Sequence, residues 1–152
     1  RTVARRLECL MRLIGGKGRI PDALALLGAG LDNRDNPGRA PSPTDPIVNN
    51  DAIGGILAYA GTVPRDDPRI SPLLLDDAVL AQFPPTLLQA SAGEYLLQDA
   101  QRFSARLTAL ERRNILSIWP GLPHVWHLFQ ASLPEAKAAV AEVARFLIAT
   151  ER

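Results

Sequence analysis

The chain has 152 residues, of which 47% are hydrophobic and 22% are charged, so it is long enough for one globular domain with a sizeable core. Its net charge is only +1, and no basic cluster is interleaved with aromatic residues, which argues against a nucleic-acid surface. No apolar run approaches the ~20 residues of a membrane span.

The first half of the chain combines a predicted helix, a short predicted strand and loop-rich stretches. Apolar residues at helical spacing predict a helix over 3–14. It contains the single cysteine, Cys9, which cannot form an internal disulfide and is typical of a reducing compartment, so we expect a cytoplasmic protein. The continuous apolar run 23–27 is typical of a strand covered on both faces. After a loop rich in Asn, Asp and Pro, a short helix is predicted over 49–60.

The second half alternates regularly between strands and helices. A strand over 86–91 leads to a helix from about 97 to 111, whose buried stripe is predicted to be Ala100, Phe103, Leu107 and Leu110. A strand over 115–119 leads to a final helix with the apolar face Val140, Val143, Ala144, Leu147 and Ile148. This order predicts the α/β class, with a mostly parallel sheet flanked by helices on both faces.

An acidic residue and a histidine follow the last two predicted strands. Glu94 comes just after strand 86–91, and His124 lies in a Pro/Gly loop after strand 115–119. Because parallel strands bring their carboxyl ends to the same edge of a sheet, we expect these two side chains to meet. A carboxylate there can orient an imidazole that acts as a general base, and acid before histidine is the order of the second half of a Ser…Asp/Glu…His triad.

Two other residues compete with this interpretation. Asp99 is the alternative acid, but it falls inside the predicted helix, where we expect interaction with the helix dipole or surface pairing. His127 forms a His-x-x-His pair with His124, but no acidic residue accompanies the pair at ligand spacing, so no metal site is predicted. No phosphate-binding glycine loop is present, and no cofactor is expected.

Four blocks of sequence resemble one known family. They are Asp67-Pro-Arg-Ile-Ser-Pro-Leu73, Phe83-Pro-Pro-Thr-Leu-Leu-Gln89, Gly93-Glu-Tyr-Leu-Leu-Gln-Asp99 and Trp119-Pro-Gly-Leu-Pro-His-Val-Trp126. In this order they resemble the hormone-sensitive-lipase-like branch of the α/β-hydrolases, the bacterial family IV esterases. The resemblance covers essentially all of the chain, but only the C-terminal half of that family.

The resemblance implies roles for particular residues. Glu94 occupies the position of the catalytic acid, where Asp is commoner, and His124 that of the catalytic histidine. Residues 1–152 would form the C-terminal half of one α/β-hydrolase domain, in which 44–62 is a short cap-type helical insert over the acyl pocket. Val125 and Trp126, beside the histidine, are candidates for contact with the substrate.

Two signatures of the family are absent from residues 1–152, namely Gly-x-Ser-x-Gly and a His-Gly-Gly oxyanion loop. By the resemblance, the nucleophilic serine should lie a few residues before Arg1. The leading hypothesis is that the chain is part of a serine carboxylesterase that acts on small acyl esters. The chain would contribute the acid and the histidine of the triad, and it would be inactive on its own. The alternative is a non-catalytic, truncated α/β module that acts only through association.

The strand over 23–27 carries a further expectation. As the first strand recognised here, it would leave an unpaired edge and a broad apolar surface in water. We therefore expect it to pair with another polypeptide, which would be the missing N-terminal half or a second copy of the chain.

Overall fold

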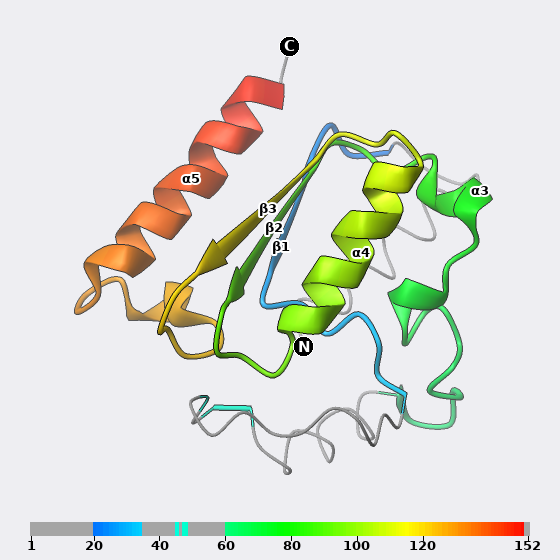
Figure 1. Ribbon diagram of the computed structural model, residues 1–152, viewed down its shortest axis with the longest axis horizontal. Helices are drawn as coiled ribbons and strands as arrows, with labels where there is room; N and C mark the ends of the chain where they lie inside the picture. The colour runs from blue at the N-terminus through cyan, green and yellow to red at the C-terminus, as the bar shows by residue number, and fades with distance from the viewer. Residues whose placement is uncertain (1–19, 35–44, 46, 49–59, 151–152) are drawn as a thin grey trace.

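The computed structural model describes residues 20–34, 45, 47–48 and 60–150. Within these ranges, one sheet consists of three parallel strands in the order β1 (Leu24–Leu27), β2 (Thr86–Ser91) and β3 (Asn114–Trp119), as Figure 1 shows. The three predicted strands are confirmed to within one residue at each end. The helix predicted over 3–14 lies outside the described residues, as does the one over 49–60 apart from Ala60.

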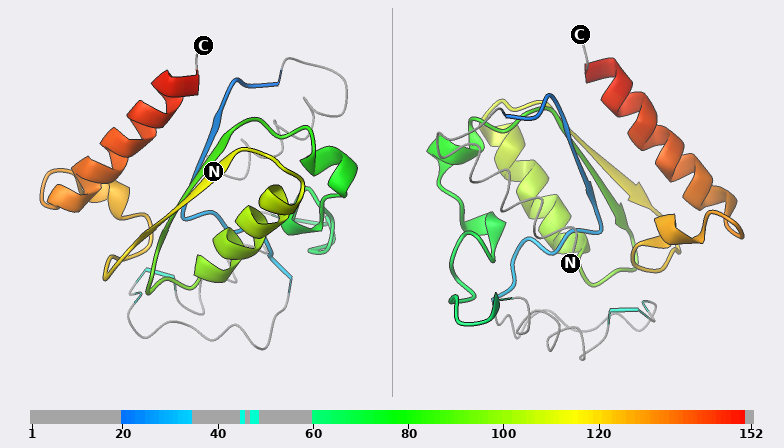
Figure 2. Two further views of the ribbon diagram at one scale, coloured as in Figure 1. Left: turned by 45° about the horizontal axis from the view of Figure 1, so that its top comes forward. Right: turned by 180° about the vertical axis from the view of Figure 1, so that it is seen from behind.

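Helices cover both faces of the sheet, as the alternating pattern predicts. α4 (Leu97–Ala109) packs on one face and α5 (Pro134–Thr150) lies on the other (Figures 1 and 2). Three short helical segments lie in the connections: η2 (Pro72–Leu74), α3 (Asp77–Leu80) and η3 (Trp126–Phe129). The result is a three-layer α/β arrangement.

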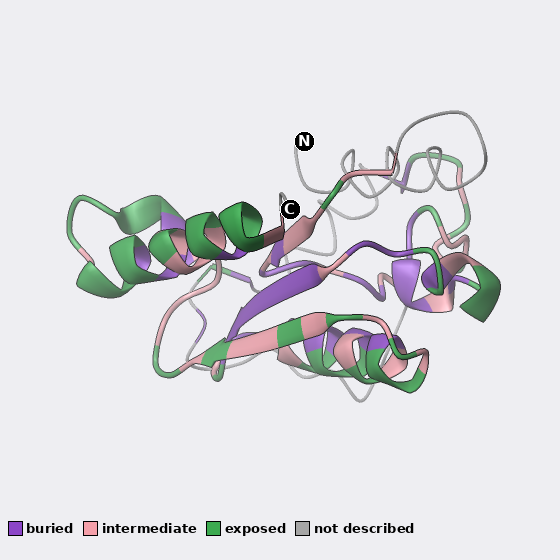
Figure 3. Cartoon of the chain, turned by 90° about the horizontal axis from the view of Figure 1, so that it is seen from above, coloured by how far each residue is buried: buried purple, intermediate pink, exposed green. Residues whose placement is uncertain are grey.

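The main apolar core lies between α4 and the sheet. Phe103 and Leu107 are completely buried there, against Leu26 and Leu88 of the strands. The ring of Phe83 meets that of Phe103 edge to face, with centroids 5.6 Å apart. Burying side chains of this size stabilises the fold by about 1.5–3 kcal/mol each. The central strand β2 lies between β1 and β3, and α4 and α5 cover it. All of its residues are therefore buried (Figure 3).

α4 ends two residues earlier than predicted. Glu111 has a left-handed backbone with φ of 56°, a conformation that glycine usually supplies after a helix. The N–H groups of Glu111 and Arg112 donate to the carbonyls of Thr108 and Leu107 at 3.0 and 2.8 Å. These two bonds form a Schellman motif, which ends the helix and turns the chain into β3.

The buried face of α5 differs from the prediction. The residues of α5 that are buried are Ala136, Ala139 and Phe146, whereas Leu147 and Ile148 are 37% and 67% exposed. Small alanines lie inward here because α5 approaches Trp126 closely and Gln89 donates from β2 to the Ala139 carbonyl. Periodicity correctly predicts a helix, but it cannot tell which neighbouring surface will cover each apolar side chain.

β1 lies at one edge of the sheet formed by the described strands. Leu26 is buried, while the other three residues of this strand are half-buried. Gly28, directly after the strand, has a φ of 53° and donates its N–H to the Gln89 carbonyl at 2.9 Å. The chain therefore leaves β1 at the same edge of the sheet at which β2 and β3 end.

Candidate active site

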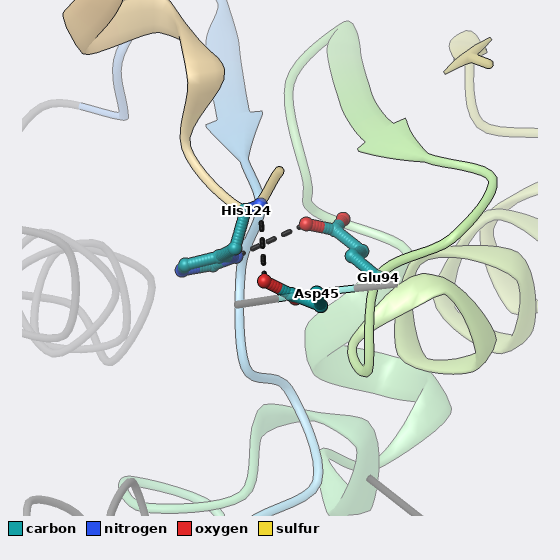
Figure 4. A group of neighbouring side chains, drawn as sticks. All are labelled: Asp45, Glu94 and His124. Carbon is teal, nitrogen blue, oxygen red and sulfur yellow. Dashed lines mark hydrogen bonds and ion pairs between the residues drawn. The ribbon is translucent and has the colours of Figure 1, made fainter. Parts of the chain in front are cut away.

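The acid and the histidine expected at the strand ends lie in contact. Nδ1 of His124 is 3.0 Å from Oε2 of Glu94, and Figure 4 shows the imidazole directed at the carboxylate. The Glu94 side chain is fully buried, while that of His124 keeps 16% exposure. The other carboxylate oxygen, Oε1, accepts the N–H of Ser91 at 3.2 Å, at the end of β2.

This arrangement selects one tautomer of the histidine. A carboxylate only accepts hydrogen bonds, so Nδ1 of His124 carries the proton and donates it to Glu94. Nε2 is then left with its lone pair, and it points away from Glu94 in Figure 4. An imidazole held in this way can take a proton at Nε2 while the carboxylate stabilises the resulting imidazolium.

Gly28 makes room for this pair. A Cβ atom added there would lie 2.8 and 2.9 Å from Cε1 and Nδ1 of His124, and 3.4 Å from Oε2 of Glu94. The positive φ of Gly28 also disfavours any residue with a side chain. Each of the three strands thus leads into the site, and β1 does so through a following residue, Gly28, that has no side chain.

The loop that carries His124 is held from the end of β2. The Ser91 hydroxyl donates to the Leu122 carbonyl and accepts the Leu122 N–H. Directly after His124, Val125 has a left-handed backbone with φ of 47°, which a β-branched residue rarely adopts. Strained backbone of this kind persists only where its surroundings hold it, and it clusters at functional sites.

Trp126 follows in η3 and is completely buried. Its indole packs against Trp119, with ring centroids 6.1 Å apart, and against the two alanines of α5. These contacts anchor the end of the histidine loop to β3 and α5. Trp126 is buried and Val125 is half-buried, and contact of either residue with a substrate stays a prediction.

Asp99 has a role that its sequence position did not suggest. It is 1% exposed, and its Oδ2 accepts the N–H groups of Leu31 and Asp32 at 2.9 and 3.0 Å. The prediction of surface pairing is therefore wrong, although Asp99 does lie in the first turn of α4. This carboxylate holds the loop that follows Gly28, since the backbone N–H groups of that loop need buried acceptors.

His127 lies in a buried polar network under α5. Its Nε2 is 2.9 Å from Oε1 of Gln89, and its ring stacks on Trp126. The amide nitrogen of Gln89 donates to the Ala139 carbonyl and to Glu142, so Oε1 accepts and His127 is the donor at Nε2. Burial, and secondarily the neighbouring His124, lowers the pKa of His127 to about 4. This histidine is therefore neutral near pH 7.

Asp45 is the member of the site that sequence reasoning missed. It is 4% exposed, and its Oδ1 accepts the backbone N–H of His124 at 3.4 Å (Figure 4). One potential ligand atom from each of Asp45, Glu94 and His124 lies within 4.8 Å of the others. These are donors that a divalent cation can use, and His127 does not belong to the group. In the described structure, Nδ1 of His124 and Oε2 of Glu94 are hydrogen-bonded to each other.

None of the serines described in the structure donates to His124. The hydroxyls donate as follows: Ser71 to the Arg65 carbonyl, Ser91 to the Leu122 carbonyl, Ser104 to Asn114, Ser117 to Glu142 and Ser132 to the Phe129 carbonyl. Ser42 lies outside the described residues. Among the described residues, no serine hydroxyl is therefore hydrogen-bonded to Nε2 of His124.

Comparison with known proteins defines the class. The family described as alpha/beta hydrolase fold matches residues 6–128. A solved esterase from the bacterial hormone-sensitive lipase family superposes with a TM-score of 0.80 at 29% identity, over 95% of this chain and 48% of that one. The structure of EstE5 soaked with p-nitrophenyl butyrate gives a TM-score of 0.83 at 25% identity, over 97% and 49%.

Curated relatives agree with these structures. An esterase of Acinetobacter venetianus is 38% identical over 104 residues, which are 67% of this chain and 33% of the relative. The carboxylesterase/phospholipase LipF of Mycobacterium tuberculosis is 32% identical over 71 residues, 47% of this chain and 19% of LipF. The chain belongs to the α/β-hydrolase family, and its structural neighbours are esterases of the hormone-sensitive lipase family. It spans about a third of the Acinetobacter esterase and about half of the solved structures.

Proposed function

We propose that residues 1–152 supply the acid and the base of a Ser–Glu–His triad in a carboxylesterase that acts on small acyl esters. The observation that supports this most strongly is the hydrogen bond between Nδ1 of His124 and the fully buried Glu94. It leaves Nε2 as the basic atom of a partly exposed imidazole. The family supports ester hydrolysis as the reaction class.

In the proposed reaction, a serine Oγ attacks the ester carbonyl carbon while its proton moves to Nε2 of His124. The imidazolium gives that proton to the alcohol oxygen as the C–O bond breaks, which leaves an acyl-serine. His124 then takes a proton from water, whose oxygen attacks the acyl carbon. The same proton returns to the serine as the carboxylic acid is released. Glu94 remains ionised throughout and orients the ring.

The serine and the oxyanion-binding amides are proposed to lie outside residues 1–152. The absence of Gly-x-Ser-x-Gly from the sequence supports this, as does the engagement of each described serine with other partners. On this proposal the chain is the C-terminal half of one hydrolase domain, with 44–62 as a cap segment. Val125 and Trp126, directly after His124, remain the candidates for contact with the acyl ester. A cytoplasmic location stays a prediction. No helix among the described residues has the length and apolarity that a membrane crossing needs.

A partner polypeptide is proposed for the free side of β1. Leu24 and Gly28 direct their N–H groups to carbonyls of the β2 side, at 2.9 Å each, and the opposite side of β1 pairs with no described strand. An unpaired strand edge favours association with another chain. We expect the nucleophile-bearing half or a second copy to pair there. Sedimentation of the chain as a stable monomer, with the outward amides of Ala25 and Leu27 exchanging freely, would contradict this.

The function is tested by comparing the chain alone with a protein that joins it to a nucleophile-bearing half of the same family. With p-nitrophenyl butyrate, we expect hydrolysis only in the joined protein, and its loss in the joined His124→Ala variant. Hydrolysis by residues 1–152 alone that disappears in His124→Ala would overturn the external nucleophile. A joined protein that folds and associates but hydrolyses no ester would favour the alternative, a non-catalytic module.

A further inference from the structure

The carboxylate of Asp45 joins two segments that lie far apart in the sequence. Its Oδ1 accepts the N–H groups of Ile47 and Val48 at 3.1 and 3.3 Å, within its own turn. The same oxygen accepts the backbone N–H of His124 at 3.4 Å, from a position 79 residues further along the chain. Figure 4 shows this carboxylate beneath the histidine, beside that of Glu94.

The burial of Asp45 is more than its turn requires. A second turn of the same kind is made by Asp67, whose Oδ1 accepts the Arg69 N–H at 2.8 Å, but that carboxylate is partly exposed and pairs with the Arg69 guanidinium. Asp45 is 4% exposed, and its Oδ2 has no hydrogen-bond partner among the described residues. A buried unpaired carboxylate oxygen reduces stability, so the turn alone does not account for this side chain.

The histidine loop needs such a contact. Ser91 holds the loop before His124 through Leu122, while Val125, just after His124, has the left-handed backbone that β-branched residues avoid. The bond from Asp45 acts at the residue between these two points. Without this bond, the residues that follow Leu122 would be free to move. Val125 would then adopt an unstrained φ, and the ring of His124 would shift.

We propose that Asp45 is a positioning residue that fixes the backbone of His124 and thereby the direction of its Nε2. This proposal rests on the proposed function for its effect on ester hydrolysis, although the clamp itself is independent of that function. Asp45 acts through its oxygen as an acceptor, so an amide in its place keeps most of the effect. It also ties the histidine loop to the turn that begins the proposed cap segment.

The test uses the joined protein and three variants: Asp45→Ala, Asp45→Asn, and Asp99→Ala as the matched control. Asp99 is an equally buried aspartate that accepts two backbone N–H groups, but at Leu31 and Asp32. Two quantities are measured, namely kcat and KM for p-nitrophenyl butyrate, and the hydrogen exchange of the peptide that contains His124.

For Asp45→Ala we expect kcat to fall by about 100-fold with KM nearly unchanged, because a displaced base impairs the reaction more than binding. Exchange at His124 should become about tenfold faster. Asp45→Asn should recover most of both quantities. Asp99→Ala should accelerate exchange at Leu31 and Asp32 and leave the exchange of the histidine loop unchanged.

Two results would overturn the proposal. Exchange at His124 in Asp45→Ala that equals the wild-type rate would show that no clamp exists. Recovery no better in Asp45→Asn than in Asp45→Ala would show that charge, not the acceptor, is what matters. If the joined protein hydrolyses no ester at all, the proposed function fails, whereas the exchange measurements still decide whether Asp45 clamps the loop.

Discussion

Two histidines three residues apart lie in opposite environments. His124 is on a loop at the strand ends, keeps 16% exposure, and donates from Nδ1 to a carboxylate. His127 is buried under α5, and its Nε2 donates to a neutral amide. The Glu94 carboxylate fixes the tautomer of His124, whereas burial lowers the pKa of His127 to about 4. The same side chain is thus suited to proton transfer in one place and to packing in the other.

The largest expected difference is in catalysis. In the joined protein, His124→Ala should reduce kcat by about 10⁴-fold or more, because it removes the proposed general base. His127→Gln keeps an N–H donor for Gln89 and should leave hydrolysis near the wild-type rate while lowering the melting temperature. Steady-state kinetics and thermal unfolding of both variants measure the contrast. A His127→Gln variant that folds but hydrolyses the ester as slowly as His124→Ala would contradict this difference between the two histidines.

The acidic partner should show the next largest effect. Glu94→Gln should reduce kcat by about 10³–10⁴-fold, since an amide can reverse the tautomer of His124. Asp99→Asn should keep most of the activity but reduce the free energy of unfolding by about 1–3 kcal/mol, because it weakens a buried acceptor of two N–H groups. Urea denaturation and kinetics separate the two losses. Comparable losses of kcat in both variants would show that the acid has been assigned wrongly.

Substitution of Gly28 tests how tightly the environment of His124 is packed. Gly28→Ala places a Cβ less than 3 Å from the ring of His124 and strains a positive φ, so kcat should fall by about 10–100-fold. Gly30→Ala is the control, because its nearest heavy atom is Oδ1 of Asn33 at 3.3 Å and it does not contact the pair. If both alanine variants keep full activity, the residue after β1 does not pack closely against the ring of His124.

The burial of His127 should make the stability of the folded protein depend on pH. In the unfolded chain a histidine titrates near 6.5, whereas His127 in the folded protein titrates at about 4. Between these values the unfolded state binds the proton and the folded state does not, so stability is complete above pH 6.5 and falls as the pH drops towards 4. The loss should reach about 2–3 kcal/mol.

Urea denaturation at pH 7 and pH 4.5 measures this loss, with His127→Gln as the control. The variant should lose less stability than the wild type between the two pH values. An identical loss in both proteins would mean that His127 is not the group responsible.

Much of this fold could be predicted from the sequence, because apolar runs bounded by Pro and Gly define the strands. The pairing of Glu94 with His124 followed from the geometry of parallel strands, whose carboxyl ends meet. Asp45 could not be predicted, since its partner is 79 residues away and no periodic pattern joins the two. The burial of Asp99 was missed for a similar reason, because an acid in a first helical turn commonly faces solvent. These contacts between loops depend on tertiary structure alone.

The central claim is that residues 1–152 supply the acid and the base to a nucleophile that lies outside them. The most direct test is to treat the joined protein with a fluorophosphonate, which loses fluoride as it bonds to an activated serine oxygen, and to locate the adduct by peptide mass spectrometry. The account predicts one adduct, on a serine outside residues 1–152, formed much more slowly in the His124→Ala variant. An adduct on Ser42, Ser71, Ser91, Ser104, Ser117 or Ser132 that depends on His124 would contradict it.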